Sequence, residues 1–188
     1  MPKIVKDEEI YQAVVQVISE RGYAGATTKQ MAEAANVSEV TLFRKYENKQ
    51  QLIQQAITFL VSQADFEAAT QYTGDMAADL LRVVQAYQES AVQNGQFIFV
   101  LLAEMQRYVE LADLLDVPLH IFSRMGDLLV RYQAEGQLRP ENPMHTLTAL
   151  LGPLIYVDML HKAMGDEVIP PLNLELHVTH FLKGRCPL

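Results

Sequence analysis

The sequence has only one cysteine among its 188 residues, and it lacks several features that mark whole classes of protein. Cys186 has no second cysteine to pair with, so no disulfide within the chain can stabilise the fold, and a reducing cytoplasm is the compartment we expect. The longest nearly apolar run, residues 147–160, is interrupted by Thr148 and Asp158 and is shorter than the roughly 18–20 residues that cross a bilayer. A basic segment followed by an apolar leader is also missing at the start, so we expect neither export nor membrane insertion.

Motifs that would indicate catalysis or metal binding are also scarce. The sequence has no HExxH motif, no glycine-rich phosphate loop and no serine-centred nucleophile elbow. His177 and His180 are three residues apart, a spacing that permits shared metal ligation on a helix, but no third ligand is evident nearby. We therefore predict no catalytic residues, no metal site and no cofactor. An all-α enzyme that uses the carboxylates and histidines of residues 61–188 is the remote alternative.

Positive charge is in the minority, because 15 Lys and Arg stand against 23 Asp and Glu, which gives a net charge of −8. Taken over the whole chain, this balance argues against nucleic acid as a partner. The distribution changes that conclusion, since residues 1–60 hold seven charges of each sign and residues 61–188 carry the whole acidic excess. Lys29, Arg44, Lys45 and Lys49 lie in the neutral part. A local group of cations can therefore bind DNA while the acidic remainder stays away from the phosphates.

Residues 27–49 are predicted to form two short helices joined by a tight turn. Thr27 and Gln30 have the spacing of a capping box, so the first helix should begin at Thr28. Asn36 tolerates a left-handed backbone and suits the corner between the helices. Ser38 should cap the second helix, which places Leu42 and Tyr46 on one face. The opposite face then carries a mixed set that suits reading base edges in a major groove: Glu39, Val40, Phe43 and Arg44.

The remaining hydrophobic residues repeat at helical spacing, with no alternating strand pattern. Besides the two short helices, we predict helices over residues 7–22, 48–63, 75–94, 96–109, 118–134, 143–164 and 173–183, with a weak connector over 64–74 and a turn at Asn94-Gly95. The predicted fold class is all-α. Residues 1–50 would form a three-helix head with a helix-turn-helix, and residues 51–188 would form a helical bundle for ligand binding and dimerisation.

From about Ile10 to Leu52, the chain resembles the DNA-binding domain of the tetracycline-repressor-like (TetR) family of bacterial transcription regulators. The matching residues are Ile10, Ala13, Glu20-Arg21-Gly22-Tyr23, Thr27-Thr28, Met31-Ala32, Ala35, Val37-Ser38, Thr41-Leu42, Lys49 and Leu52. The sequence departs from the family where glycine usually stands at Asn36, and where tyrosine and phenylalanine usually stand at Phe43 and Tyr46. We expect Asn36 to hold the same turn and Tyr46 to fill the same place in the core. Phe43 removes a hydroxyl that the family offers to a phosphate.

Eleven residues are predicted to contact DNA. Within the second helix, Arg44 could bind guanine through two hydrogen bonds, Glu39 could accept a hydrogen bond from cytosine and Val40 could contact a thymine methyl group. Phosphate contacts set affinity and register rather than sequence. The full set of predicted DNA-binding residues is Thr27, Thr28, Lys29, Ser38, Glu39, Val40, Thr41, Phe43, Arg44, Lys45 and Lys49.

The C-terminal bundle is rich in methionine and aromatic residues, which build cores but also adaptable apolar pockets. Glu104 and Asp158 lie in apolar surroundings, where each would either receive a ligand group, pair with Arg107 or His161, or remain exposed. The predicted ligand-binding residues are Tyr87, Phe99, Glu104, Met105, Tyr108, Met125, Tyr156 and Met159.

Residues 147–160 are apolar nearly all round the helix, so two sides need cover, and a second subunit is the economical cover for one of them. The family resemblance implies a homodimer formed through the last two helices. We therefore expect a regulator of transcription that binds a palindromic operator and responds to a small, largely apolar or aromatic effector, as a repressor rather than an activator. The alternative is a DNA-binding dimer that is controlled by a protein partner and has no small-molecule effector.

Overall fold

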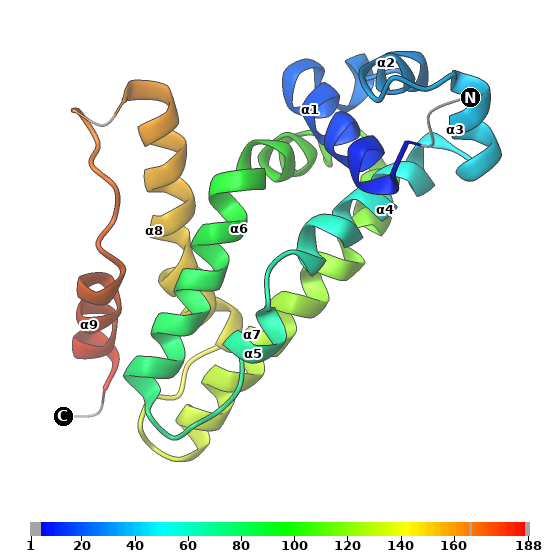
Figure 1. Ribbon diagram of the computed structural model, residues 1–188. Coiled ribbons are helices and arrows are strands. Elements are labelled where there is room, and N and C mark those ends of the chain that lie inside the picture. The colour runs from blue at the N-terminus through cyan, green and yellow to red at the C-terminus, as the bar shows by residue number, and fades with distance from the viewer. Residues whose placement is uncertain (1–4, 166, 187–188) are drawn as a thin grey trace. The chain divides into compact units, whose positions relative to one another are not determined.

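A computed structural model describes residues 5–165 and 167–186, and all the regular elements in these ranges are helical. Nine α-helices and one 3-10 helix follow one another along them (Figure 1). They are α1 (Asp7–Gly25), α2 (Thr28–Ala34), α3 (Glu39–Lys45), α4 (Lys49–Ser62), α5 (Phe66–Ala69), α6 (Met76–Glu104), η1 (Val109–Leu115), α7 (Asp116–Ala134), α8 (Pro143–Met164) and α9 (Leu174–Arg185). The predicted all-α fold class is confirmed. Within the described ranges, no helix has the length and apolar character that a membrane span requires.

The chain folds into two compact units. The first contains Met1–Gln63 and Asn94–Pro118, and the second contains Ala64–Gln93 and Leu119–Leu188. Each unit therefore draws on two separate stretches of sequence, and α6 and α7 contribute to both units. The functional boundary expected at residue 50 stays a prediction, and α4 packs against α1 inside the first unit.

The core of the first unit joins the N-terminal helices to residues of the later stretch. Ile10 and Ile18 of α1, Met31 of α2 and Leu42 of α3 are buried together with Ile57 of α4. Burying one such side chain stabilises a fold by about 1.5–3 kcal/mol. The same core also contains four buried side chains from the second stretch of this unit: Phe97, Leu101, Leu111 and Leu114. The core of the first unit thus includes side chains from outside the predicted three-helix head.

Local capping explains where the short helices begin. The Thr27 side chain accepts a hydrogen bond from the Gln30 backbone, and the Gln30 side chain accepts one from the Thr27 backbone, which completes the predicted capping box. Ser38 and Asn48 cap α3 and α4, as the sequence predicts. Asn36 has a φ of 55°, so the left-handed corner predicted for it is also confirmed.

The end of α1 differs from the prediction. Gly22 was expected to terminate this helix, but helical hydrogen bonding resumes beyond it as far as Gly25. Gly22 does break the regular geometry, with φ 74° and ψ 170°, and forms a kink in place of an end. This conformation suits glycine because a Cβ atom would be strained there.

The second unit is anchored by a buried carboxylate near the start of α6. Asp79 is fully buried and accepts hydrogen bonds from the Thr73 hydroxyl at 2.5 Å, the Tyr132 hydroxyl at 2.5 Å and Arg82 at 2.8 Å. Burial by itself raises the pKa of Asp79, but these hydrogen bonds outweigh it and hold the pKa below the usual range. The contacts connect the segment before α6 to α7.

The turn predicted at Asn94-Gly95 is wrong, because α6 continues through it to Glu104. Asn and Gly each disfavour a helix by about 1 kcal/mol or less. The apolar period continues past them, and Phe97 and Leu101 bury their side chains on it. Burial of two large side chains exceeds the local cost, so the two helices expected here merge into one. The connector predicted over 64–74 also contains a short helix, α5.

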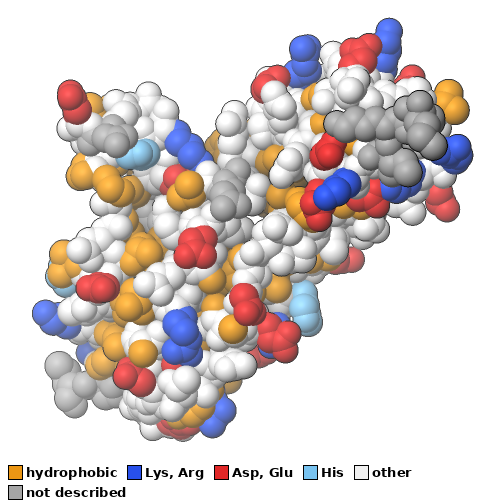
Figure 2. Space-filling model, in the orientation of Figure 1, with side chains coloured by type: hydrophobic (Ala, Val, Ile, Leu, Met, Phe, Trp, Pro, Cys, Tyr) orange, Lys and Arg blue, Asp and Glu red, His pale blue; other side chains and the backbone are white. Residues whose placement is uncertain are grey.

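The helix α8 begins at Pro143 and ends before Gly165, as predicted, and α9 follows Asn173 as its cap. One side of α8 is covered within its unit, where Leu147, Leu150 and Leu154 are buried. Contact with α9 includes a hydrogen bond of 2.7 Å from His177 Nε2 to the Leu150 carbonyl. Figure 2 shows hydrophobic side chains reaching the surface where these two helices lie.

Candidate DNA-binding site

The outer face of α3 presents the side chains that the sequence predicts for it. Val40 is 78% exposed and Phe43 is 50% exposed, whereas Leu42 on the inner face is only 2% exposed. Tyr46 is buried just after the helix and packs edge-on against Tyr11 of α1, with ring centroids 6.1 Å apart. The helix is therefore fixed through one face, while apolar tips remain in water on the other.

The N-terminal ends of α2 and α3 lie together. The Thr28 hydroxyl donates to Glu39 Oε1 at 2.6 Å, and the hydroxyls of Ser38 and Thr41 are hydrogen-bonded at 2.8 Å. Lys29 is exposed. Backbone N–H groups and hydroxyls at helix starts are suitable hydrogen-bond donors to phosphate oxygens.

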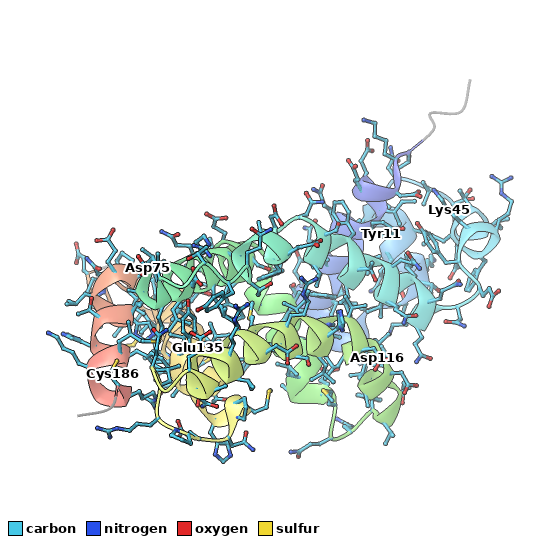
Figure 3. All side chains as sticks on the ribbon, turned by 90° about the horizontal axis from the view of Figure 1, so that it is seen from below. Tyr11, Lys45, Asp75, Asp116, Glu135 and Cys186 are labelled. Carbon is cyan, nitrogen blue, oxygen red and sulfur yellow. The ribbon has the colours of Figure 1, made fainter. Side chains whose placement is uncertain are left out.

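The three remaining predicted cations differ in their surroundings. Arg44 is exposed and, among the described residues, has no hydrogen bond or ion pair. Lys45, which Figure 3 labels on the first unit, forms an ion pair with Asp7. Lys49 is half-buried, donates to the Tyr23 carbonyl and lies 4.0 Å from the centre of the Tyr23 ring. Of these three cations, Arg44 is thus the one most free to reach a base.

The surroundings of Lys49 also shift the pKa of its amino group. Burial lowers its pKa, while the nearby carboxylates of Glu104 and Glu110 act in the opposite direction. Burial, together with the charge and hydrogen bond of Glu110, raises the pKa of Tyr23. Lys49 therefore interacts with Tyr23 and with these carboxylates inside the first unit, in addition to its predicted contact with a phosphate.

A carboxylate from the end of α6 completes this cluster. Glu104 Oε2 accepts the Tyr23 backbone N–H at 2.9 Å, and a Cβ atom built at Gly22 would lie 2.6 Å from Glu104 Oε1. The Tyr108 ring packs on the Tyr23 ring with centroids 5.3 Å apart. A Cβ atom at residue 22 would therefore meet the Glu104 carboxylate, which would have to shift from the position in which it accepts the Tyr23 N–H. We call Gly22, Tyr23, Lys49, Glu104 and Tyr108 the corner cluster.

The eight predicted ligand-binding residues are divided between the two units. In the first unit, Glu104 and Tyr108 belong to the corner cluster, Met105 packs against the hydrophobic core, and Phe99 is half-exposed. The backbone of Tyr23 is the partner of the Glu104 carboxylate, in place of the Arg107 or His161 considered from the sequence.

The other four predicted residues lie in the second unit. Met125 is buried, Tyr87 is half-buried beside Phe122 with ring centroids 6.3 Å apart, and Tyr156 and Met159 are exposed on α8. Burial, together with the charge of Asp158, raises the pKa of Tyr87 to about 12. Asp158 itself pairs with Lys162 at 2.9 Å. Tyr87 therefore keeps its proton at neutral pH and can donate it.

Among the described residues, no group of three or more His, Cys, Asp or Glu side chains is arranged to hold a metal ion. His177 contacts the Leu150 carbonyl, and His161 Nδ1 lies 2.8 Å from the Ile169 carbonyl. Both imidazoles therefore take part in hydrogen bonds to the backbone.

Sequence reasoning identified the exposed face of α3 but missed the corner cluster and the Thr28–Glu39 hydrogen bond. Their members are separated by as many as 81 residues for Tyr23 and Glu104. No periodicity or cap signal reports such a pair. The only local indication was Gly22, where a glycine in a positive-φ position marks a close approach as well as a kink.

A short capped helix that is packed on a helical core through Leu42 and displays Val40, Phe43 and Arg44 defines the class of helix-turn-helix DNA-binding proteins. Figure 2 shows Lys and Arg interspersed with Asp and Glu over the N-terminal helices, in agreement with the neutral balance of residues 1–60.

Comparison with known proteins narrows this class to one family. Residues 10–56 match the profile of the bacterial regulatory proteins of the tetR family. The chain is 27% identical over 183 residues to the uncharacterised HTH-type transcriptional regulator YvkB of Bacillus subtilis, covering 95% of this chain and 96% of that protein. Residues 10–56 thus have the DNA-binding domain of this family, and over nearly its whole length the chain is similar to an HTH-type transcriptional regulator.

Solved structures share the fold over nearly the whole chain. A TetR-family transcription regulator from Marinobacter aquaeolei VT8 has a TM-score of 0.70 at 16% identity and covers 97% of this chain and 96% of its own. A transcriptional regulator from Rhodococcus sp. RHA1 has a TM-score of 0.71 at 16% identity, with coverages of 97% and 99%. At these identities the likeness concerns the fold.

Proposed function

We propose that this regulator binds a palindromic operator as a homodimer and releases it when a small, largely apolar or aromatic effector binds. The observation that carries the proposal is the exposed face of α3, where Arg44, which has no ion pair or hydrogen bond among the described residues, stands beside Val40 and Phe43. Leaving two large apolar side chains in water is unfavourable unless the face has a partner. A major groove offers thymine methyl groups to the apolar tips and guanine to the arginine.

Within this proposal, the predicted residues take different parts. Arg44 and Glu39 contact bases, and Val40 and Phe43 make apolar contacts. Thr27, Lys29, Ser38, Thr41 and Lys45 contact phosphates, which positions the helix without reading sequence. Lys49 stabilises the corner cluster through its bond to the Tyr23 carbonyl, and its positive charge adds to the attraction of the DNA phosphates.

Dimerisation would proceed through α8 and α9. Ile155, Tyr156 and Met159 are exposed on α8, and Leu176 is 52% exposed on α9, so the pair of helices has an apolar side without cover in a single chain. A second copy would cover it with the same residues, as two-fold interfaces do. Two α3 helices could then occupy successive major grooves, about 34–36 Å apart, which predicts a palindromic operator.

The effector would act through α6, whose residues run without interruption from the second unit into the corner cluster of the first. Tyr87 and Met125 lie on the second-unit side and are candidates to contact the effector. An effector shifts the equilibrium only as far as it binds one state better than the other. The alternative regulator is a protein partner, and the cytoplasm is the compartment in which such a regulator would meet the chromosome.

The test is a mobility-shift titration of the full-length protein on the DNA upstream of its own coding sequence. A shuffled duplex of the same composition serves as the comparison. Wild type should prefer the upstream duplex, and Arg44→Ala should weaken specific binding by about 10-fold or more. Arg124→Ala is the matched control, because it removes an exposed arginine from the second unit. Equal binding to both duplexes, or equal losses in the two variants, would contradict the proposal.

A further inference from the structure

Two side chains from different helices of the first unit are joined where α2 and α3 begin. Thr28 stands at the first position of α2, and Glu39 stands at the first position of α3. The Thr28 hydroxyl donates to Glu39 Oε1 at 2.6 Å. The sequence predicts that Thr28 and Glu39 each contact DNA on their own, whereas the structure joins them by a hydrogen bond.

The hydrogen bond makes the two carboxylate oxygens of Glu39 different, because only Oε1 accepts from Thr28. A threonine hydroxyl has a single proton, and Thr28 gives it to Oε1, so this proton is not available to a phosphate. Oε2 has no hydrogen bond among the described residues and remains able to accept one. The bond also orders the Glu39 side chain before DNA binds, so less conformational entropy is lost in the binding step.

The charge of Glu39 restricts what the free oxygen can meet on DNA. A carboxylate is repelled by phosphates, so it favours binding only where a donor lies within reach. In the major groove, guanine presents only acceptors and thymine presents an acceptor and a methyl group. Adenine presents an amino group beside the N7 acceptor, whereas cytosine presents its N4 amino group without that neighbour. Cytosine is therefore the base that a carboxylate selects.

We propose that Thr28 and Glu39 form one reading unit, in which Thr28 anchors one carboxylate oxygen and the other accepts from the N4 amino group of a cytosine in each half-site. Glu39 determines specificity, and Thr28 is its positioning residue. The inference rests on the proposed function, because it assumes that α3 enters a major groove.

The experiment selects bound sequences from a randomised duplex library with the full-length protein and then measures affinities for single-base variants of the selected operator by fluorescence anisotropy. Wild type should select a palindrome with cytosine at one symmetric pair of positions and prefer it there by about 10-fold over other bases. Glu39→Ala should lose the preference at those positions alone. Glu39→Gln should move it towards adenine, because an amide both donates and accepts.

The role of Thr28 has its own readout. Thr28→Val keeps the shape but removes the hydroxyl, and should lower the cytosine preference about 5-fold or more, whereas Thr28→Ser should retain it. Thermal unfolding of each variant shows whether the head is folded. Glu33→Gln, which removes an exposed carboxylate from α2, is the control for charge and should leave the base preference unchanged.

Each outcome decides a separate claim. If wild type selects no sequence, the proposed function and this inference both fail. If wild type selects an operator and Glu39→Ala selects the same bases at every position, the inference alone is wrong. If Thr28→Val keeps the full preference while Glu39→Ala loses it, the positioning role of Thr28 is wrong.

Discussion

Asn36 adopts a backbone angle that most residues avoid. Its φ of 55° lies in the left-handed region, and its backbone N–H donates to the Glu33 carbonyl at 3.1 Å in the turn between α2 and α3. Asparagine tolerates this region better than alanine, and glycine tolerates it without steric cost.

Asn36→Ala should therefore lower the free energy of unfolding by about 1 kcal/mol, measured by urea denaturation. Asn36→Gly is the matched variant and should stay within about 0.5 kcal/mol of wild type, because relief of strain offsets the added flexibility of the unfolded chain. If alanine and glycine behave alike, the strain assigned to this corner is absent.

Asp79 predicts a pH-dependent effect. Tyr132→Phe removes one donor from a fully buried carboxylate and should lower stability at pH 7 by roughly 1.5–3 kcal/mol. Because the pKa of Asp79 in the folded state is depressed, the stability it contributes is present above its unfolded pKa, near 4, and is lost as the pH falls through the folded pKa. The gap between wild type and variant should therefore narrow below pH 4.

The control for that series is Tyr72→Phe. The Tyr72 hydroxyl donates to Glu135 at 2.7 Å at the surface, where water can replace the lost bond, so Tyr72→Phe should cost clearly less stability than Tyr132→Phe. Urea titrations at several pH values measure both variants. An equal gap at pH 3 and pH 7 for Tyr132→Phe would show that Asp79 does not carry the effect.

Residue-scale features were predictable where the signal was local. Thr27, Ser38 and Asn48 cap helices through contacts three residues away, and such spacings can be recognised in the sequence. The bonds from Thr28 to Glu39 and from Tyr23 to Glu104 join different helices. They depend on how the helices pack, which no local pattern specifies.

At the scale of helices, the same distinction explains the one merged element. The sequence predicts a turn at Asn94-Gly95 from the preference of these residues for turns, a preference that is weak beside the burial of Phe97 and Leu101. The exposed face of α3 was predictable because Leu42 and Tyr46, four residues apart, mark the buried face and leave Val40 and Phe43 on the opposite side.

The meeting of α1 with the end of α6 gives a prediction about Gly22. Gly22→Ala combines positive-φ strain with a Cβ atom 2.6 Å from Glu104 Oε1. Gly136→Ala has nearly the same φ, 73°, with nothing within 4 Å of the added atom. Urea denaturation should therefore show that Gly22→Ala costs at least about 1 kcal/mol more than Gly136→Ala.

A second substitution identifies the source of that difference. Adding Glu104→Ala to Gly22→Ala removes the carboxylate that the new Cβ would meet, so the double variant should lose less stability than the sum of the single variants. Additive losses would show that the carboxylate does not limit the size of residue 22.

For the whole molecule, the central prediction concerns dimerisation. Tyr156 is 60% exposed on α8, and Tyr156→Glu would place a charge in the proposed interface. The variant should be monomeric by sedimentation and bind a palindromic operator roughly 100-fold or more weakly, because each head then binds alone. Val130→Glu, at a position 44% exposed on α7, is the control and should remain dimeric. A wild-type protein that is monomeric at all concentrations, alone and on DNA, would contradict the proposed assembly.

The core of the first unit has a consequence for protein engineering. Phe97, Leu101, Leu111 and Leu114 fill the same core as α1 to α4 although they come from a stretch that begins 31 residues after Gln63. A chimera that took only the first 63 residues would lack the four side chains that complete their hydrophobic core, and would expose apolar surface to water. Swapping operator preference between relatives would therefore mean transplanting the face of α3 alone, or moving both stretches together.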